Sequence, residues 1–253
     1  MGEHVAPTTP ARKKRSNIFW NIVGVVGELL ITFAIVVGLF SVWQLYWTTY
    51  EVAGQVSQTI ASYEEQHQPS KRTLGDVRTD DPPAFDREVG DGEVYGLVHV
   101  PTWDWMKIPL AEGTTSYVLD QGWAGHYDMT TQPGGVGNFS IAGHRRTYGN
   151  NFRWIDRLTP GDKVVVEVDD HYLVYSMVSS EIIDATDPTQ MRVVAPVIDD
   201  VSWSETPTER WMTMTTCHPE YGNWQRYIVH LKFESWTPKD TGVPAELVDE
   251  PTN

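Results

Sequence analysis

The chain has 253 residues, of which 34 are acidic and 19 are basic, so its net charge is −15 at pH 7. Residues 1–17 contribute four basic and one acidic side chain. Glu28 is the only other charge before residue 51, which leaves −17 on residues 51–253. Nucleic acid requires a basic binding surface, so this composition excludes it as a partner. The same charge opposes flat docking of the domain on an anionic membrane.

An apolar run extends from residue 18 to residue 47, directly after a basic cluster at residues 12–15. A membrane-spanning helix needs about 20 apolar residues, so the run predicts one span. Glu28 costs about 3 kcal/mol within it, which the apolar neighbours offset. Because the next basic residue is Lys71, we expect a cytoplasmic tail at 1–17, a signal anchor at 18–47 and an extracellular remainder. A cleaved signal peptide is the alternative, but the run is too long and lacks a small-residue cleavage site.

Residues 48–88 are polar and predict an extracellular stalk. Gln55–Gln66 can continue as helix, whereas residues 68–72 and 80–83 have the composition of a linker. At the other end of the chain, residues 238–253 predict a disordered acidic tail. The segment 89–237 is long enough for one domain with a single core.

Hydrophobicity within 89–237 mostly alternates, which predicts β-strands separated by Gly and Pro turns. The expected strands are Val94–Val100, Trp105–Pro109, Asn138–Gly143, Lys163–Val168, Tyr172–Ser179, Arg210–Thr216 and Tyr227–Glu234. A short helix is expected at Asn151–Leu158, ended by Pro160 and Gly161. So many short strands favour a closed or nearly closed barrel, a mainly all-β fold.

The single cysteine, Cys217, lies nine residues before Arg226 and has no second cysteine with which to form a disulfide. A thiolate beside a positive charge is a strong nucleophile, and a guanidinium can stabilise an oxyanion. Strand alternation places Cys217 and Arg226 on the same outer face of a hairpin and at the same end of it. The alternative is a buried structural cysteine.

Of the eight histidines, His144 is the best placed to exchange a proton with this thiol. It follows the strand that contains Phe139 and Ile141, on the face opposite to those two residues, so a cleft can reach it. His218 is adjacent to Cys217 in sequence, but neighbouring strand residues point to opposite faces. A structural histidine is the alternative. Scattered histidines and one cysteine give no metal-ligand spacing, so no metal and no cofactor are expected.

These residues lie in recognisable motifs. Thr213-Met214-Thr215-Thr216-Cys217, followed by Arg226, resembles the sortase signature Thr-Leu-x-Thr-Cys with a later Arg, except that Met214 replaces the usual Leu. Ala142-Gly143-His144-Arg145 matches the histidine motif of the same family. Residues 125–127, 143–149, 157–162 and 216–219 are similar to actinobacterial class E sortases. The resemblance covers residues 92–236, with the motifs in the family's order.

The resemblance implies a sortase β-barrel of eight strands and cysteine transpeptidation. Cys217 would be the nucleophile, His144 the general acid and base, and Arg226 the group that orients the substrate or stabilises the oxyanion. Substrate-binding residues would be Tyr127, Thr215 and Thr216. The implied substrates are surface proteins with a C-terminal LAxTG- or LPxTG-like sorting signal, cleaved between Thr and Gly. The implied acceptor is an amine of a peptidoglycan precursor, and no cofactor is implied.

Three alternatives remain. The chain could be a pilus-polymerising sortase, although Asp81-Pro82-Pro83 lacks the aromatic residue of the lid motif in many of those enzymes and no second apolar span is visible. It could be a plain cysteine peptidase, which a dependence of rate on added amine would separate from a transpeptidase. It could also be a membrane-tethered barrel without catalytic activity that binds surface proteins.

Overall fold

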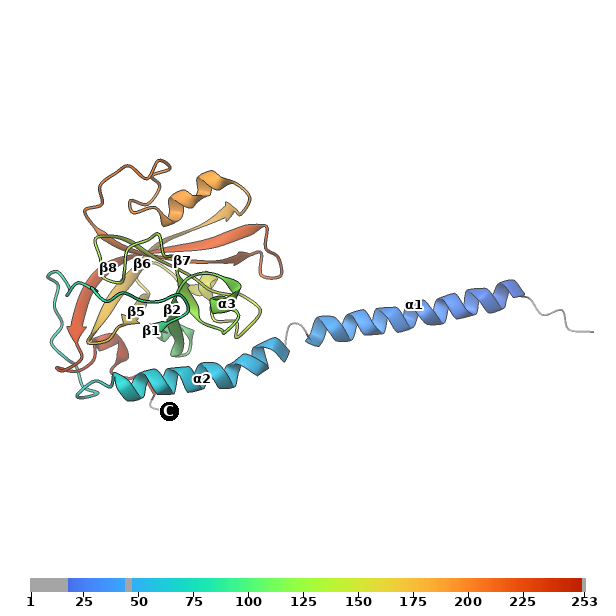
Figure 1. The fold of residues 1–253 in the computed structure, drawn as a ribbon, viewed down its shortest axis with the longest axis horizontal. Coiled ribbons are helices and arrows are strands. Elements are labelled where there is room, and N and C mark those ends of the chain that lie inside the picture. Colours follow the sequence, from blue (N-terminus) through green and yellow to red (C-terminus); the bar gives the residue numbers. More distant parts are fainter. Residues whose placement is uncertain (1–17, 44–46, 252–253) are drawn as a thin grey trace, which may run out of the picture. The chain divides into compact units, whose positions relative to one another are not determined.

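The computed structural model of the protein describes residues 18–43 and 47–251 (Figure 1). It comprises two compact units, Met1–Trp43 and Gln44–Asn253. The described part of the first unit is essentially helix α1 (Ile18–Val42), which has one charged residue, Glu28, in 25 and buries none of its side chains. At about 1.5 Å per residue it is about 37 Å long, enough to cross a hydrocarbon core of about 30 Å. Residues 1–17 and 44–46 of the expected tail and anchor lie outside the described residues.

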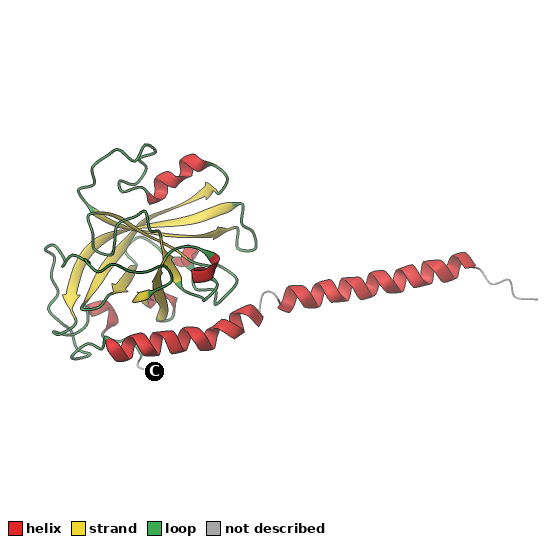
Figure 2. Cartoon of the chain, in the orientation of Figure 1, coloured by secondary structure: helices red, strands yellow, loops and turns green. Residues whose placement is uncertain are grey.

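The second unit contains helix α2 (Thr48–Gln66) and a closed barrel of eight strands (Figure 2). The strands are β1 (Val94–Val100), β2 (Met106–Glu112), β3 (Ala124–His126), β4 (Gly137–Ala142), β5 (Lys163–Glu167), β6 (His171–Asp184), β7 (Arg210–His218) and β8 (Gln225–Pro238). Neighbours around the barrel follow the order β1-β2-β3-β4-β7-β8-β6-β5, with β2–β3 and β4–β7 parallel. The expected closed eight-stranded barrel is confirmed.

Individual elements differ from the expected ones in instructive ways. The bounds of β1 are as expected, whereas β6 and β8 each continue for 14 residues, because their far halves pair with each other although much of β6 there is exposed. β3 was not expected, since three residues carry no periodicity. The helix expected at Asn151–Leu158 is only a 3₁₀ turn at Ile155–Arg157. There the Phe152 amide donates to the His144 carbonyl at 3.0 Å, so the start of this segment is held in turns.

The barrel core is formed by inward-facing side chains, among them Met212 and Met214 of β7, as strand alternation predicts. The outer face of the same strand is also covered. Thr213 and Thr215 are buried, because the connection between β6 and β7, which contains the 3₁₀ helix Pro188–Val194, lies over this part of the sheet (Figure 1). Asn138 fixes this cover by donating from Nδ2 to the carbonyls of Val193 and Ala195.

The segment expected to be a stalk lies along the barrel. Helix α2 contacts β1 and β2 and buries Val52 and Tyr63. Beyond the helix, Leu74 forms a β-bridge with Val243, and Arg78 forms one with Trp236. Residues 48–88 therefore do not project as a free spacer, since buried apolar side chains and backbone pairing hold the described part of this segment to the domain.

The expectation of a disordered tail at 238–253 is wrong for the described residues up to 251. Val243 and Leu247 are buried, and the Ala245–Leu247 stretch forms a 3₁₀ turn. The side chain of Glu250 is 1% exposed and pairs with Arg72, His99 and Lys107. The acidic composition of this segment suggests that it is solvated. In the structure, however, His99 of β1 and Lys107 of β2 bind the carboxylate of Glu250.

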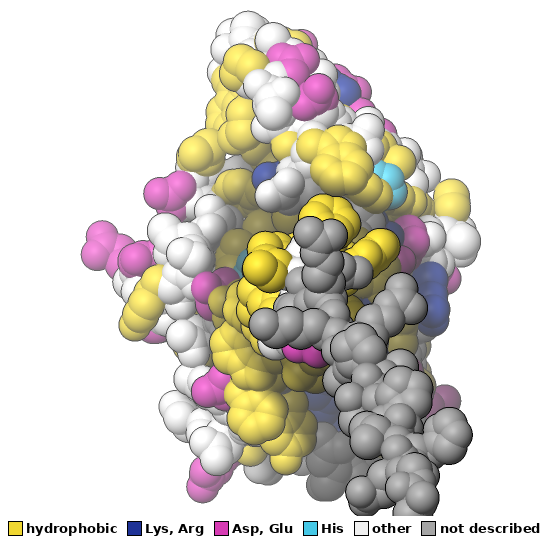
Figure 3. Space-filling model, turned by 90° about the vertical axis from the view of Figure 1, so that its right-hand side faces the viewer, with side chains coloured by type: hydrophobic (Ala, Val, Ile, Leu, Met, Phe, Trp, Pro, Cys, Tyr) yellow, Lys and Arg dark blue, Asp and Glu magenta, His cyan; other side chains and the backbone are white. Residues whose placement is uncertain are grey.

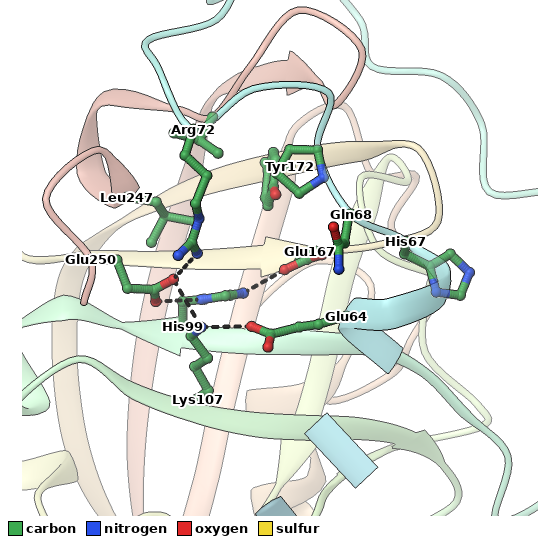
Figure 4. Close-up of a pocket in the computed structure, with 12 residues that line it drawn as sticks. Glu64, His67, Gln68, Arg72, His99, Lys107, Glu167, Tyr172, Leu247 and Glu250 are labelled. Carbon is green, nitrogen blue, oxygen red and sulfur yellow. Dashed lines mark hydrogen bonds and ion pairs between the residues drawn. The ribbon is translucent and has the colours of Figure 1, made fainter. Parts of the chain in front are cut away.

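Glu250 belongs to a buried cluster of charged side chains centred on His99 (Figure 4). His99 Nδ1 lies 2.8 Å from Glu250 Oε1, and Nε2 lies 2.8 Å from Glu167 Oε2. Burial alone would lower the pKa of His99, but the hydrogen bonds to both carboxylates raise it to about 9. The cluster lines a cavity of about 260 Å³ between the end of α2, the barrel and the C-terminal segment. We therefore interpret it as a lock that holds these three parts together.

Candidate active site

The hairpin of β7 and β8 pairs Cys217 directly with Arg226. This confirms the pairing expected from strand alternation. Side chains of directly opposed residues in an antiparallel pair lie on the same face, with Cβ atoms about 5 Å apart. Cys217 is a free cysteine of intermediate burial. The tight turn that follows, with the Gly222 amide donating to the Pro219 carbonyl, returns the chain to Arg226.

His144 reaches the same end of the barrel by a different route. Strand β4 lies parallel to β7, and Ala142 is the partner of Thr215. The pairing continues beyond the strand, because the Gly143 amide donates to the Thr215 carbonyl at 3.1 Å and Thr216 Oγ1 donates to the Gly143 carbonyl at 2.6 Å. Two residues beyond Ala142 and Thr215 come His144 and Cys217. The parallel register therefore brings His144 level with the thiol.

The imidazole of His144 is oriented by a carboxylate that sequence reasoning missed. Nε2 lies 2.8 Å from Asp120 Oδ1, and the ring of Tyr148 lies against the imidazole with centroids 5.3 Å apart. Because Nε2 is engaged, Nδ1 is the ring nitrogen available to a reacting group. Asp120 follows the short helix α3 (Ser116–Leu119), 24 residues before His144. No spacing in the sequence could identify it.

Helix α2 supports the turn that carries Asp120. Gly122 has a left-handed backbone conformation, with φ +77°, and a Cβ added there would lie 2.9 Å from Val56 Cγ2 and 3.0 Å from the Tyr148 carbonyl oxygen. Only glycine allows so close an approach. Gln55 Nε2 also donates to Gln121 Oε1 at 2.8 Å. The helix expected to be part of a stalk thus helps to position the partner of His144.

The Arg226 guanidinium has no carboxylate partner among the residues that the structure describes. Its Nη1 donates to the backbone carbonyls of Asn223 and Gln225 at 2.8 and 2.9 Å. These carbonyls orient the side chain without neutralising its charge. Its remaining N–H groups can therefore donate to a carbonyl oxygen or oxyanion bound beside Cys217.

The three residues expected to bind substrate have different environments. The Tyr127 hydroxyl and Thr215 Oγ1 are hydrogen-bonded at 2.9 Å. Burial raises the pKa of Tyr127, which the Thr215 hydrogen bond opposes, and charges on Arg226 and Cys217 also act on this pKa. Thr216 is buried and donates to the Gly143 carbonyl, so its hydroxyl joins β7 to the segment after β4 instead of facing a ligand.

Apolar side chains extend from Tyr127 beneath the connection between β6 and β7. Tyr127 and Trp203 pack against a buried cluster of Ile183, Val193, Val194 and Ile228. This cluster is separate from the barrel core. The described residues contain no group of three or more His, Cys, Asp or Glu placed to hold a metal ion.

The register thus brings a free cysteine, a histidine oriented by a carboxylate and an arginine without a carboxylate partner to the same end of an eight-stranded barrel, which is the arrangement expected of a sortase. The sortase domain model matches residues 98–234, and the chain belongs to the sortase family. Sortase SrtE1 of Streptomyces coelicolor is 36% identical over 229 residues, which cover 88% of this chain. The chain spans 60% of the length of that relative.

Solved structures agree in fold. The SrtA sortase from Actinomyces oris is 44% identical, with a TM-score of 0.64, and its match covers 70% of this chain and 100% of that one. Sortase E1 from Streptomyces coelicolor, solved with a tripeptide in its active site, is 38% identical with a TM-score of 0.55. That match covers 63% of this chain and 99% of the solved chain. These similarities place the chain beside class E sortases, as the sequence motifs predict.

Proposed function

We propose that this chain is a membrane-anchored cysteine transpeptidase that cleaves an LAxTG- or LPxTG-like sorting signal between Thr and Gly. It would then join the upstream protein to an amine of a peptidoglycan precursor. The proposal is supported above all by the register that brings Cys217 opposite Arg226 and level with His144. Membership of the sortase family adds the expected type of reaction.

In the first step, the Cys217 thiolate attacks the carbonyl carbon of the Thr residue. The oxyanion that forms accepts hydrogen bonds from Arg226. The C–N bond to Gly then breaks, and protonated His144 donates its proton to the departing amine, leaving a thioacyl enzyme. Asp120 holds the imidazole by Nε2, so Nδ1 is the atom that handles this proton. The hydrogen-bonded pair of Tyr127 and Thr215 would lie beside the Thr carbonyl of the bound signal.

In the second step, the acceptor amine attacks the thioester carbon. Neutral His144 takes the proton from the amine, the C–S bond breaks, and the thiolate of Cys217 is restored. Water can replace the amine, which would give hydrolysis. Helix α1 would hold the domain at the outer membrane surface, with the N-terminus cytoplasmic, because basic residues precede the span.

The test is mass spectrometry of a protein comprising residues 47–253 incubated with LAxTG and LPxTG peptides, with and without an amine acceptor. We expect a covalent adduct on Cys217 and an amine-dependent product joined through Thr. Only hydrolysed peptide, at a rate independent of added amine, would identify a cysteine peptidase instead. If neither peptide labels Cys217 in the folded protein, the proposal is overturned.

A further inference from the structure

Four arginines lie within 13 residues directly after His144. Arg145, Arg146, Arg153 and Arg157 share this stretch with a single acidic residue, Asp156. Residues 51–253 as a whole are strongly acidic, with 32 acidic and 15 basic side chains. On the face shown in Figure 3, acidic side chains are scattered over the surface and basic side chains occur only in small groups. The cluster is therefore a local exception to the charge of the domain.

Two of these arginines join the loop after β4 to the turn between β7 and β8. Arg145 is buried, with Nη2 2.8 Å from Asp156 Oδ2 and Nη1 2.9 Å from His218 Nδ1. Arg146 pairs with Glu220, and its guanidinium lies 5.1 Å from the centroid of the exposed Tyr221 ring. Glu220 and Tyr221 belong to the turn between Cys217 and Arg226. These two arginines therefore lie between the loop after His144 and the turn that joins Cys217 to Arg226.

Arg153 and Arg157 have no carboxylate within ion-pair distance among the residues that the structure describes. Instead their guanidinium groups lie near the ring of Trp154, at 3.9 and 4.8 Å from its centroid. Burial lowers the pKa of Arg153, and the charges of Arg146 and Arg157 lower it further. Nε of Arg146 and of Arg153 is buried without a hydrogen-bond partner among the described residues. Positive charge therefore accumulates here with Asp156 and Glu220 as its counter-charges.

Such an arrangement suits an anion. Guanidinium groups bind carboxylates and phosphates through paired hydrogen bonds, and a stacked, preoriented guanidinium loses less entropy on binding. The position of the arginines beside His144 also indicates which of the two substrates, the sorting signal or the amine acceptor, would carry that anion. In the proposed second step the attacking amine must give its proton to His144, so the acceptor approaches from the side of the cleft on which the cluster lies.

We propose that Arg146, Arg153 and Arg157 form a binding site for an anionic group, a carboxylate or a phosphate, on the amine acceptor. This inference rests on the proposed transpeptidase function and extends it to the class of acceptor. The site would raise the local concentration of anionic amines beside the thioester, so that attack by the amine competes with attack by water.

The experiment compares matched acceptors with one thioacyl enzyme. Diglycine and diglycine amide differ in a carboxylate, and 2-aminoethyl phosphate and ethanolamine differ in a phosphate. For each acceptor, the ratio of transfer product to hydrolysed peptide is measured in the wild type, in the double variant R153Q/R157Q and in the single variant R157Q. The matched control is Arg87→Gln, because Arg87 is also a half-exposed arginine but pairs with Glu93 and Asp169 away from the cleft.

We expect the wild type to favour the anionic member of at least one pair, and the preferred pair identifies the carboxylate or the phosphate as the anion. The double variant should reduce that preference about tenfold, which is the effect of losing a hydrogen bond to a charged group. Arg157→Gln should give a smaller reduction and Arg87→Gln none.

Two outcomes would overturn the inference. The first is no anionic preference in the wild type, or a preference that persists in a double variant with an unchanged melting temperature. The second is weaker sedimentation of the double variant with phosphatidylglycerol vesicles at unchanged transfer ratios, which would assign the cluster to the membrane. Because every measurement begins from a thioacyl enzyme observed by mass spectrometry, these outcomes leave the proposed function standing. Absence of that adduct would overturn the proposed function itself.

Discussion

Two histidine–carboxylate pairs in this domain differ in exposure and therefore in what they can do. His144 and Asp120 are 24% and 34% exposed, and only Nε2 of the imidazole is engaged. His99, Glu167 and Glu250 are 3%, 5% and 1% exposed, and both ring nitrogens of His99 are engaged. An imidazole with two buried carboxylate partners keeps its charged form at neutral pH, because these partners raise its pKa. One with a free nitrogen at a cleft can give and take a proton.

The comparison shows that residue type alone does not separate a reactive site from a structural lock. Both histidines come from or follow a barrel strand, and both contact carboxylates remote in sequence. We therefore expect substitutions in the His144–Asp120 pair to alter turnover at nearly constant stability. Substitutions in the buried cluster of His99, Glu167 and Glu250 should alter stability at nearly constant turnover.

The largest effect is expected for Cys217→Ala. Removing the nucleophile should abolish the thioacyl adduct and lower transpeptidation by at least about a thousandfold, since no other described side chain at this end offers a thiol. Adduct formation is read by mass spectrometry and folding by circular dichroism. Transpeptidation retained by a folded Cys217→Ala protein would remove Cys217 from the mechanism.

Next come His144→Ala and Arg226→Ala, each expected to lower kcat/KM by about 10²- to 10⁴-fold with the melting temperature nearly unchanged. Arg226→Lys is the matched variant, because it keeps the positive charge and loses the fork of donors. It should recover only part of the activity. If either alanine variant turns over at a rate close to that of the wild type, the role assigned to its residue is wrong.

At the other end of the comparison, His99→Gln should cost about 3 kcal/mol of unfolding free energy, because it removes the buried cation that bridges Glu167 and Glu250. Glu167 would keep only Lys239 as a partner, and Glu250 would keep Arg72 and Lys107. Urea unfolding measures this loss, and turnover below the transition should stay close to that of the wild type. Lys163→Gln is the control, since its ion pair with Glu234 is exposed and should contribute no measurable stability. Equal stability of both variants would show that the cluster is not a lock.

Much of the fold followed from local pattern. The alternation around Met212 and Met214 oriented β7, and the same period of two placed Cys217 opposite Arg226. Register between these strands could be inferred because one face had to be buried. The positions of the motif residues Cys217, Arg226 and His144 could be predicted for the same reason, because they lie at strand ends that the alternation locates.

The remainder depended on partners far away in the chain. Glu250 is ordered by His99, 151 residues before it, so an acidic tail that looks solvated is fixed by ion pairs. Asp120 reaches His144 only through the turn after α3 and the packing of α2. The three-residue strand β3 exists because β2 and β4 flank it. Tertiary contacts of this kind leave no periodic trace.

Asp120 offers a sharper test of the His144 pair. Asp120→Ala should lower kcat about tenfold and leave KM nearly unchanged, because it frees the imidazole to turn while the peptide groove stays intact. Asp120→Asn keeps an oxygen that can accept from Nε2 and should restore much of the loss. Steady-state kinetics with an LAxTG peptide and a fixed amine separates the two constants. A rise in KM alone would mean that Asp120 serves the groove instead of the histidine.

The smallest effect expected is a pH dependence of stability that traces to His99. Its pKa of about 9 lies above the usual value of 6.5, because the hydrogen bonds to Glu167 and Glu250 outweigh burial. A raised pKa in the folded state stabilises fully below pH 6.5, and this contribution is lost as the pH rises through 9. The urea midpoint should therefore fall between pH 7 and pH 10 in the wild type. In His99→Gln that fall should be smaller, because the group that loses its proton is gone. An identical fall in the two proteins would assign the alkaline sensitivity to other groups and weaken the contrast between the two histidines.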